Sequence, residues 1–300
     1  MKRSAVISGI DGQDGQYLRA LLVAQGLEVA GLAKPPLGSP AGGVACPAAV
    51  DELVARVRPD FFFHLAASST TRHDVLFENH ATIVTGTLNI LEAIRRHRPD
   101  CRVFLAGSGL QFVNTGAPIS EHAPFAPSSA YALARIQSVY AARYYRQLGV
   151  KAYVGYLFHH ESPLRKPMHL SRMIADAAQR IAAGSEERIR LGDISVRKEM
   201  AFAGDIVAGI WTLVQQDRIF EAAIGTGVGY SIQDWLEVCF ARIGKEWSNY
   251  VAPMPDFVPE FQTLVSNPAT MNSLGWRPQT SIDELARMML TGTPATTTQG

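Results

Sequence analysis

The chain has 300 residues, of which 47% are hydrophobic and 18% charged, and its formal net charge is +1. This composition is typical of a chain that buries a substantial core, and the length fits one large two-lobed globule. Acidic and basic residues are mixed along the chain, which argues against a nucleic-acid partner, because nucleic-acid-binding surfaces show clustered Lys and Arg.

The three cysteines are far apart and lack the spacing of metal ligands. A disulfide framework and a metal site are therefore not expected, and a reducing compartment fits this cysteine usage. No window approaches the roughly 18 apolar residues of a membrane span. We expect a cytoplasmic protein with no membrane partner.

The first half of the chain alternates short apolar runs with segments of helical periodicity. Strands are predicted at 4–8, 28–33, 61–65, 102–106 and 152–157, and helices at 17–25, 82–95 and 130–148. Because strands that alternate with helices need crossover connections, we expect a parallel sheet covered on both faces. The predicted fold class is α/β, a Rossmann-type doubly wound sheet.

The remaining segments are less regular. Residues 35–49 hold four prolines and three glycines, which predicts an irregular surface loop. Beyond Phe158, helices are predicted at 168–183, 204–215, 232–243 and 282–290. This pattern suggests a smaller mixed lobe at the C-terminal end.

A glycine turn joins the first predicted strand to the first helix. Residues 8–15 have the spacing G-x-x-G-x-x-G, with Gly9, Gly12 and Gly15 at the glycine positions. Glycine permits a tight turn and lets backbone N–H groups approach a pyrophosphate, and the helix N-terminus adds partial positive charge. The turn predicts a dinucleotide cofactor.

The end of the second strand bears on the choice between NAD(H) and NADP(H). NAD enzymes usually carry an acidic residue there for the ribose hydroxyls. Here the segment is Gly31-Leu32-Ala33-Lys34, with no carboxylate to repel a 2′-phosphate and with Lys34 able to attract one. NADP(H) is therefore expected rather than NAD(H).

Three residues form a candidate hydride-transfer site. Tyr131 and Arg135 lie four residues apart on one predicted helix, so both can reach one cleft, and Ser108 follows the preceding strand. The positive charge of Arg135 would favour the phenolate of Tyr131, which would exchange a proton with a sugar hydroxyl or ketone. Ser108 would hydrogen-bond the same oxygen.

Several ordered motifs resemble the extended short-chain dehydrogenase/reductases, and most closely the GDP-mannose 4,6-dehydratase family. Residues 8–15 resemble TGITGQDG, 64–69 NLAAQS, 86–93 GTLNLLEA, 120–125 SE..PF, and 274–278 LGWKP. Residues 155–163, GYLFHHESP, are close to GILFNHESP, and residues 191–197 resemble an LGN…R segment. The resemblance runs from about residue 5 to residue 290.

This resemblance implies a nucleotide-sugar substrate, with GDP as the expected nucleotide, and a homodimer or tetramer. It divides the chain into an NADP-binding Rossmann domain, 1–158, and a mainly nucleotide-sugar-binding lobe, 159–300, with part of 196–228 returning to the first domain. The cofactor contacts expected from the glycine turn and the resemblance together are Gly9, Asp11, Gly12, Gln13, Asp14, Gly15, Lys34, Leu65, Ala66, Ala67, Tyr131, Arg135, His160 and Arg165. The substrate contacts expected are Ser68, Ser108, His159, Arg172 and Arg197.

The chain departs from the family pattern at two chemically important positions. The glutamate of STSELYG, which is the family's acid–base group, is Leu110 here, and leucine cannot move protons. The lysine of Y-x-x-x-K is Arg135, which keeps the charge but not the compact ammonium.

Three functions therefore stay open. The first is reduction of a 4-keto-6-deoxy nucleotide sugar by NADPH, which needs the Ser, Tyr and cation but no base for C5. The second is a 4,6-dehydratase or epimerase with an atypical base, such as His159, His160 or a water bound to Gln111. The third is a non-catalytic homologue that binds NADP or a nucleotide sugar.

Overall fold

A six-stranded parallel sheet forms the centre of the larger lobe in the computed structural model, which describes residues 2–32 and 43–292. The strand order is β10-β5-β4-β3-β1-β2, and every neighbouring pair is parallel. The strands are β1 (Ser4–Ser8), β2 (Glu28–Leu32), β3 (Phe61–His64), β4 (Arg102–Ser108), β5 (Lys151–Leu157) and β10 (Glu221–Ile224). The predicted Rossmann-type fold is confirmed.

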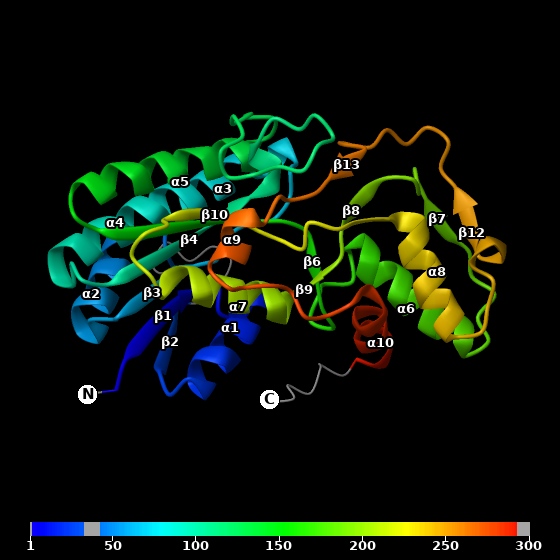
Figure 1. Cartoon of the computed structure of the whole chain (residues 1–300), viewed down its shortest axis with the longest axis horizontal. Coiled ribbons are helices and arrows are strands. Elements are labelled where there is room, and N and C mark those ends of the chain that lie inside the picture. Colours follow the sequence, from blue (N-terminus) through cyan, green and yellow to red (C-terminus); the bar gives the residue numbers. More distant parts are fainter. Residues whose placement is uncertain (1, 33–42, 293–300) are drawn as a thin grey trace.

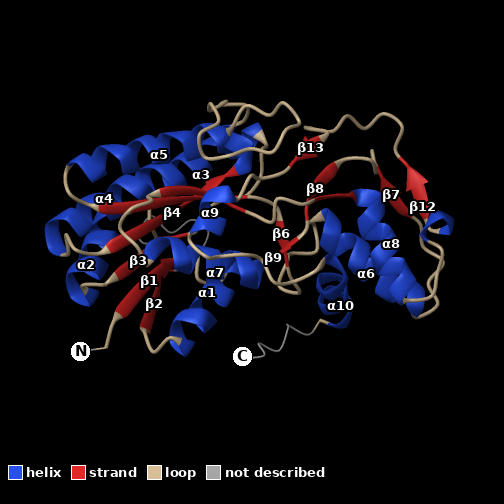
Figure 2. Ribbon diagram, in the orientation of Figure 1, coloured by secondary structure: helices blue, strands red, loops and turns tan. Residues whose placement is uncertain are grey.

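Helices cover both faces of this sheet (Figures 1 and 2). On one face lie α1 (Gln13–Ala24) and α7 (Ala203–Val214), and on the other lie α2 (Pro47–Val57), α4 (Gly86–His97) and α5 (Ala130–Gln147). Successive strand residues point to opposite faces, so Val6 and Phe62 enter one core cluster while Ile7 and Phe63 enter the other. Strands buried on both faces explain the continuous apolar runs in the sequence.

The structure corrects two local expectations. The part of the predicted loop at 35–49 that the structure describes is not all loop, because α2 begins at Pro47 and Val44 is buried against the α2 and α4 core. Proline suits the first turn of a helix, where its missing N–H has no intrahelical acceptor. The helix expected from residue 82 instead begins at Leu76 in α3 (Leu76–Asn79) and passes through a π-helical segment, His80–Thr85, before α4.

The smaller lobe packs three helices around its own core. These are α6 (Leu170–Ala182), α8 (Ile232–Arg242) and α10 (Ile282–Thr291), and the fully buried Trp235 lies among them. Short strands flank the helices: β7 (Ile189–Leu191), β8 (Arg197–Glu199), β11 (Gly229–Ser231), β12 (Val251–Pro253) and β13 (Thr263–Leu264). A two-stranded pair, β6 (His160–Glu161) with β9 (Ala201–Phe202), lies between the lobes (Figure 1). A five-residue helix, α9 (Ala269–Ser273), contacts β10.

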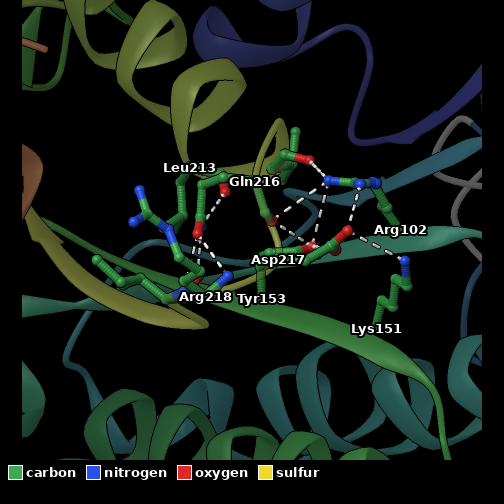
Figure 3. Close-up of polar contacts among 9 residues, drawn as sticks. Arg102, Lys151, Tyr153, Leu213, Gln216, Asp217 and Arg218 are labelled. Carbon is green, nitrogen blue, oxygen red and sulfur yellow. Dashed lines mark hydrogen bonds and ion pairs between the residues drawn. The ribbon is translucent and has the colours of Figure 1, made fainter. Parts of the chain in front are cut away.

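The two edges of the large sheet differ in their polar contacts. At the amino edge, Arg102 and Lys151 begin β4 and β5 and both pair with Asp217, as Figure 3 shows. At the carboxyl edge the strands end at a cavity instead. No helix within the described ranges is long and apolar enough to cross a bilayer.

Candidate active site

A cavity of about 430 Å³ lies where β1, β3, β4 and β5 end. Ligands of open α/β sheets bind at the carboxyl ends of the strands, so this is the expected place for a site. The cavity brings together most of the residues that the sequence singled out: Gly9, Asp11, Gly12, Gln13, Asp14, Gly15, Leu65, Ala67, Ser108, Tyr131, Arg135, His159, His160 and Arg165.

The glycine turn has no room for side chains. Gly9 has a φ of 79°, and a Cβ on it would lie 2.9 Å from the backbone N of Ala66. A Cβ on Gly15 would lie 2.3 Å from the carbonyl oxygen of Gly9. No side chain caps the N-terminus of α1, which begins directly after Gly12. This cradle fits the pyrophosphate of a dinucleotide, because close backbone approach and an uncapped helix N-terminus both favour phosphate.

Ser108 and Tyr131 reach the cavity from β4 and α5. The Oγ of Ser108 accepts a hydrogen bond from Leu110 N at 3.2 Å, and its backbone N donates to Gln111 Oε1 at 2.9 Å. This reciprocal pair fixes the short turn after β4. Among the described residues no group accepts the hydroxyl proton of Ser108, so this proton is available for a ligand in the cavity.

Arg135 is buried, with 4% of its surface exposed. Its Nη1 donates to the carbonyl oxygen of Ala106 at 2.5 Å, and its guanidinium carbon lies 5.0 Å from the centroid of the Tyr131 ring. In the described part of the chain no carboxylate lies within ion-pair distance of it. The longer side chain thus contacts the ring face and β4, and its charge has no internal counter-ion.

A buried histidine lies at the end of β3, in the electrostatic range of Arg135. His64 Nε2 faces the carbonyl oxygen of Thr82 at 3.1 Å and must donate to it, so Nδ1 accepts from Ser8 Oγ at 2.7 Å. Burial, reinforced by the charge of Arg135, lowers the pKa of His64 to about 3. His64 is therefore neutral and holds one fixed tautomer.

The wall beside Tyr131 is apolar. Leu110, at the position of the family's acid–base glutamate, lines the cavity and packs against the cluster that contains Tyr131. Gln111 is fully buried and does not line the cavity. A water-activating role for Gln111 therefore has no support from its position.

The two histidines after β5, His159 and His160, differ in their pKa shifts and hydrogen bonds. Burial, with the nearby charges of Lys198 and Arg165, holds the pKa of His159 well below its ordinary value, so His159 is neutral and a weak base. His160 faces Phe158 O with Nδ1 and Asp14 Oδ1 with Nε2. Both ring nitrogens of His160 are thus committed to protein acceptors, and neither can accept a proton from a substrate.

Several predicted contacts lie elsewhere. Lys34 is outside the described residues. Ala66 does not line the cavity, although its backbone packs on Gly9. The Ser68 side chain donates to Glu78 rather than facing the cavity.

The two arginines expected at the substrate are paired within the smaller lobe. Arg172 contacts Asp176 at 2.7 Å and Pro163 O at 2.9 Å. Arg197 is half-exposed, donates to Gly229 O and lies 3.8 Å from Asp234. Neither arginine lines the cavity, and their contact with a substrate stays a prediction.

A cation that the sequence interpretation missed is Lys198. It is buried beside cavity residues, since its charge acts on His159 and His169, and burial lowers its pKa despite attraction from Glu161. Arg165 lines the cavity next to it and pairs with Glu161 at 3.2 Å. No periodic pattern in the sequence marked this lysine, because β8 has three residues and both Lys198 and Glu199 are buried after the exposed Arg197. No group of three or more His, Cys, Asp or Glu in the described ranges is arranged to hold a metal ion.

Sequence comparisons identify relatives of this chain that belong to one enzyme family. The model of a family described as GDP-mannose 4,6 dehydratase matches residues 42–289. A GDP-mannose 4,6-dehydratase of Sinorhizobium fredii is 31% identical, with 96% of each chain covered, and GDP-mannose 4,6 dehydratase 2 of Arabidopsis thaliana is 29% identical over 96% of this chain and 86% of its own.

Solved structures share the fold. RMD from Pseudomonas aeruginosa complexed with NADPH superposes with a TM-score of 0.83 at 20% identity, covering 97% of each chain. UDP-glucose 4-epimerase of Thermus thermophilus with NAD gives a TM-score of 0.81 at 22% identity, covering 96% of this chain and 98% of its own.

Proposed function

Because the chain belongs to the GDP-mannose 4,6-dehydratase family, we propose that it is an NADP(H)-dependent reductase of a 4-keto-6-deoxy sugar carried on a nucleotide, most simply GDP. The observation that carries this proposal is the cavity wall beside Tyr131. It keeps Ser108, Tyr131 and a cation but presents Leu110 where the family resemblance leads us to expect a glutamate. Ketone reduction needs the first three groups and no base at C5.

The chain's own residues supply positioning and the proton. The free hydroxyl proton of Ser108 would bond the carbonyl oxygen of the sugar, and Tyr131 would deliver a proton to that oxygen. A bound NADPH would supply hydride to the carbon. One hydride and one proton convert the ketone to an alcohol, so the atoms balance. Arg135 lies against the Tyr131 ring and would stabilise the phenolate that remains.

The remaining cavity residues offer no strong base for removing the C5 proton. Asp11 and Asp14 are the carboxylates that line the cavity within the described residues, and both belong to the glycine turn. His160 has no free nitrogen, and His159 is a weak base because its pKa is depressed. An acid–base group usually contributes about 10²–10⁴-fold, so its loss weighs against efficient dehydration.

The cations of the smaller lobe support an anionic substrate. Arg165 and Lys166 line the cavity, and Lys198 is buried next to Arg165 with no hydrogen bond or ion pair to a described residue. A diphosphate suits such a wall, because it supplies a counter-charge for Lys198, which has no ion pair of its own. We propose that the diphosphate of the nucleotide sugar contacts Arg165 and Lys166, which line the cavity, and that the buried Lys198 adds positive charge behind them.

We propose NADP(H) as the cofactor. The described end of β2 carries Gly31 and Leu32 and no carboxylate that would repel a 2′-phosphate. The glycine cradle accepts the pyrophosphate of either dinucleotide, so NAD(H) is the alternative to test. Comparing the two dissociation constants decides between them.

A second candidate function is a 4,6-dehydratase or epimerase that uses His159 as its base. His159 lines the cavity and is neutral, which is the state a base requires. Its depressed pKa makes it weak, so we rank this function second. A protein that binds these ligands without turnover is the remaining outcome.

Two incubations separate the outcomes. In one, the protein receives GDP-mannose and NADP⁺; in the other, it receives GDP-4-keto-6-deoxymannose and NADPH. Oxidation of NADPH with the ketone supports the reductase. A keto product from GDP-mannose without net cofactor change supports the dehydratase, and binding without turnover in both overturns catalysis.

We also propose a homo-oligomer in the cytoplasm. Leu88 on α4 and Leu133, Tyr140 and Tyr144 on α5 are exposed apolar side chains, and helix pairing would bury them. Light scattering of the purified chain tests this: a dimer or tetramer agrees with the proposal, and a monomer contradicts it.

A further inference from the structure

His160 and Asp14 join the smaller lobe to the glycine turn. His160 Nε2 lies 2.9 Å from Asp14 Oδ1, and Nδ1 lies 2.6 Å from the carbonyl oxygen of Phe158. A carbonyl oxygen and a carboxylate oxygen only accept hydrogen bonds, so both ring nitrogens must donate. A histidine with two donors is an imidazolium.

The alternative, a protonated Asp14, conflicts with its surroundings. Asp14 is in the first turn of α1, where the helix dipole favours a carboxylate. Burial by itself would raise the pKa of Asp14, but attraction and hydrogen bonding from His160, with a bond from Gln13, hold it below its ordinary value. For His160, burial disfavours the charged form, yet Asp14 raises its pKa above the ordinary value.

We infer that His160 is a positioning residue for the cofactor: as an imidazolium fixed between Phe158 and Asp14, it sets the start of α1 and neutralises the carboxylate beside the phosphate cradle. The inference rests on the proposed dinucleotide at the glycine turn. A neighbouring contact ties the same segments, since Ser162 Oγ donates to Gln13 Oε1 at 2.8 Å. His160 therefore acts through Asp14 and not through a nitrogen of its own on the cofactor.

The charges around His160 set the direction of the pH effect. Asp14 from α1 stabilises the imidazolium, while Arg165 after β6 opposes it, and the adjacent His159 is neutral. As the pH rises through the raised pKa of His160, one ring nitrogen loses its proton and faces an acceptor. The Asp14 carboxylate is then uncompensated next to bound phosphates, so cofactor affinity falls at high pH.

The test measures NADPH dissociation constants by fluorescence between about pH 6 and about pH 9. We expect the wild-type constant to rise about tenfold over this range, which corresponds to about 1.4 kcal/mol. His160→Asn should bind weakly already at low pH and lose this dependence, and the double variant with Asp14→Asn should show less than additive loss. Parallel titrations with NADH, which lacks the 2′-phosphate, remove the ligand's own titration.

A second histidine–aspartate pair, in the larger lobe and away from the cavity, provides a matched control for His160→Asn. His97 also contacts an aspartate, Asp51, at 2.8 Å, but neither lines the cavity. His97→Asn should keep the wild-type affinity and pH profile. A His160→Asn profile that matches wild type overturns the inference.

A second measurement needs neither cofactor nor a folded variant. In ¹⁵N-histidine-labelled wild type, His160 should show two protonated ring nitrogens at neutral pH. A neutral His160 there overturns the inference while leaving the proposed reductase untouched. Failure of wild type to bind either dinucleotide overturns both the proposed function and the positioning role, whatever the state of His160.

Discussion

The two edges of the large sheet differ in how their charged side chains are paired. At the amino edge (Figure 3), Arg102 donates to Val214 O at 2.6 Å and pairs with Asp217 at 2.9 Å, and Tyr153 donates to Gln216 O and Asp217. A hydrogen bond from Tyr153 holds the pKa of Asp217 below its ordinary value, with further help from Lys151 and Arg102. Every charged group of this network has an internal partner.

Facing the carboxyl edge, two buried cations have no carboxylate partner, although Arg165 there pairs with Glu161 and His160 with Asp14. Arg135 bonds a carbonyl oxygen and a ring face, and Lys198 has no hydrogen bond or ion pair to a described residue. Burying an unpaired charge destabilises the fold. Such charges are typical of functional sites, where a bound ligand can supply the counter-charge. We therefore expect the charged groups of the amino edge to contribute to stability and those of the carboxyl edge to ligand binding, so substitutions at the two edges should change different measured quantities.

The largest expected effect is at Tyr131. Tyr131→Phe should lower kcat by about 10²–10⁴-fold because the proton donor is lost, while the NADPH dissociation constant stays within about twofold of wild type. Tyr153→Phe at the amino edge is the matched control and should keep kcat. Persisting turnover in Tyr131→Phe would show that another group moves the proton.

Acid should destabilise the carboxyl edge through His64. Its folded pKa of about 3 lies below the ordinary value of about 6.5, so the unfolded chain binds the extra proton first and stability falls as the pH drops below about 6.5. Urea unfolding at about pH 4.5 should show a loss of about 2–3 kcal/mol attributable to this group. His64→Asn should be less stable at neutral pH and less sensitive to acid. If the loss of stability at low pH is the same in His64→Asn as in wild type, protonation of His64 is not its cause.

Lys198 should change substrate binding more than chemistry. Lys198→Met keeps length and removes charge, and we expect KM for the nucleotide sugar to rise about tenfold with kcat nearly unchanged, since the diphosphate loses the attraction of a buried positive charge next to Arg165. Arg197→Met on the adjacent, outward-facing position is the control. Equal effects of the two variants would contradict the assignment of the inward face to the diphosphate.

The smallest effect on activity is expected at Asp217. Asp217→Asn should lower the free energy of unfolding by about 1–2 kcal/mol, because it weakens contacts with Arg102 and Lys151. Kinetic constants of the folded fraction should match wild type. A loss of turnover without a loss of stability would contradict the prediction that the amino edge contributes to stability and not to activity.

The sequence predicted five of the six strands of the large sheet, from apolar runs of five or six residues, but not the edge strand β10. The glycine turn and the Tyr131–Arg135 spacing were predicted because both are local patterns within one turn or one helix. The helix α2 was missed because its proline opens a helix instead of ending one. Strands of two or three residues, such as β8, are too short to show a periodic signal.

Contacts that depend on register or on distant segments were not predictable in this way. Arg197 and Lys198 differ by one residue, and in a strand that difference reverses the face. The commitment of both His160 nitrogens depends on Asp14, 146 residues away in the sequence. Neither composition nor spacing carries that information.

Isotope transfer tests the central claim most directly. With NADPH deuterated at the transferred position and the 4-keto sugar in ordinary water, we predict one deuterium at C4 of the product. With unlabelled NADPH in D₂O, we predict none at C5. Deuterium appearing at C5 from solvent, with none delivered to C4 by the cofactor, would contradict the reductase and favour a dehydratase or epimerase.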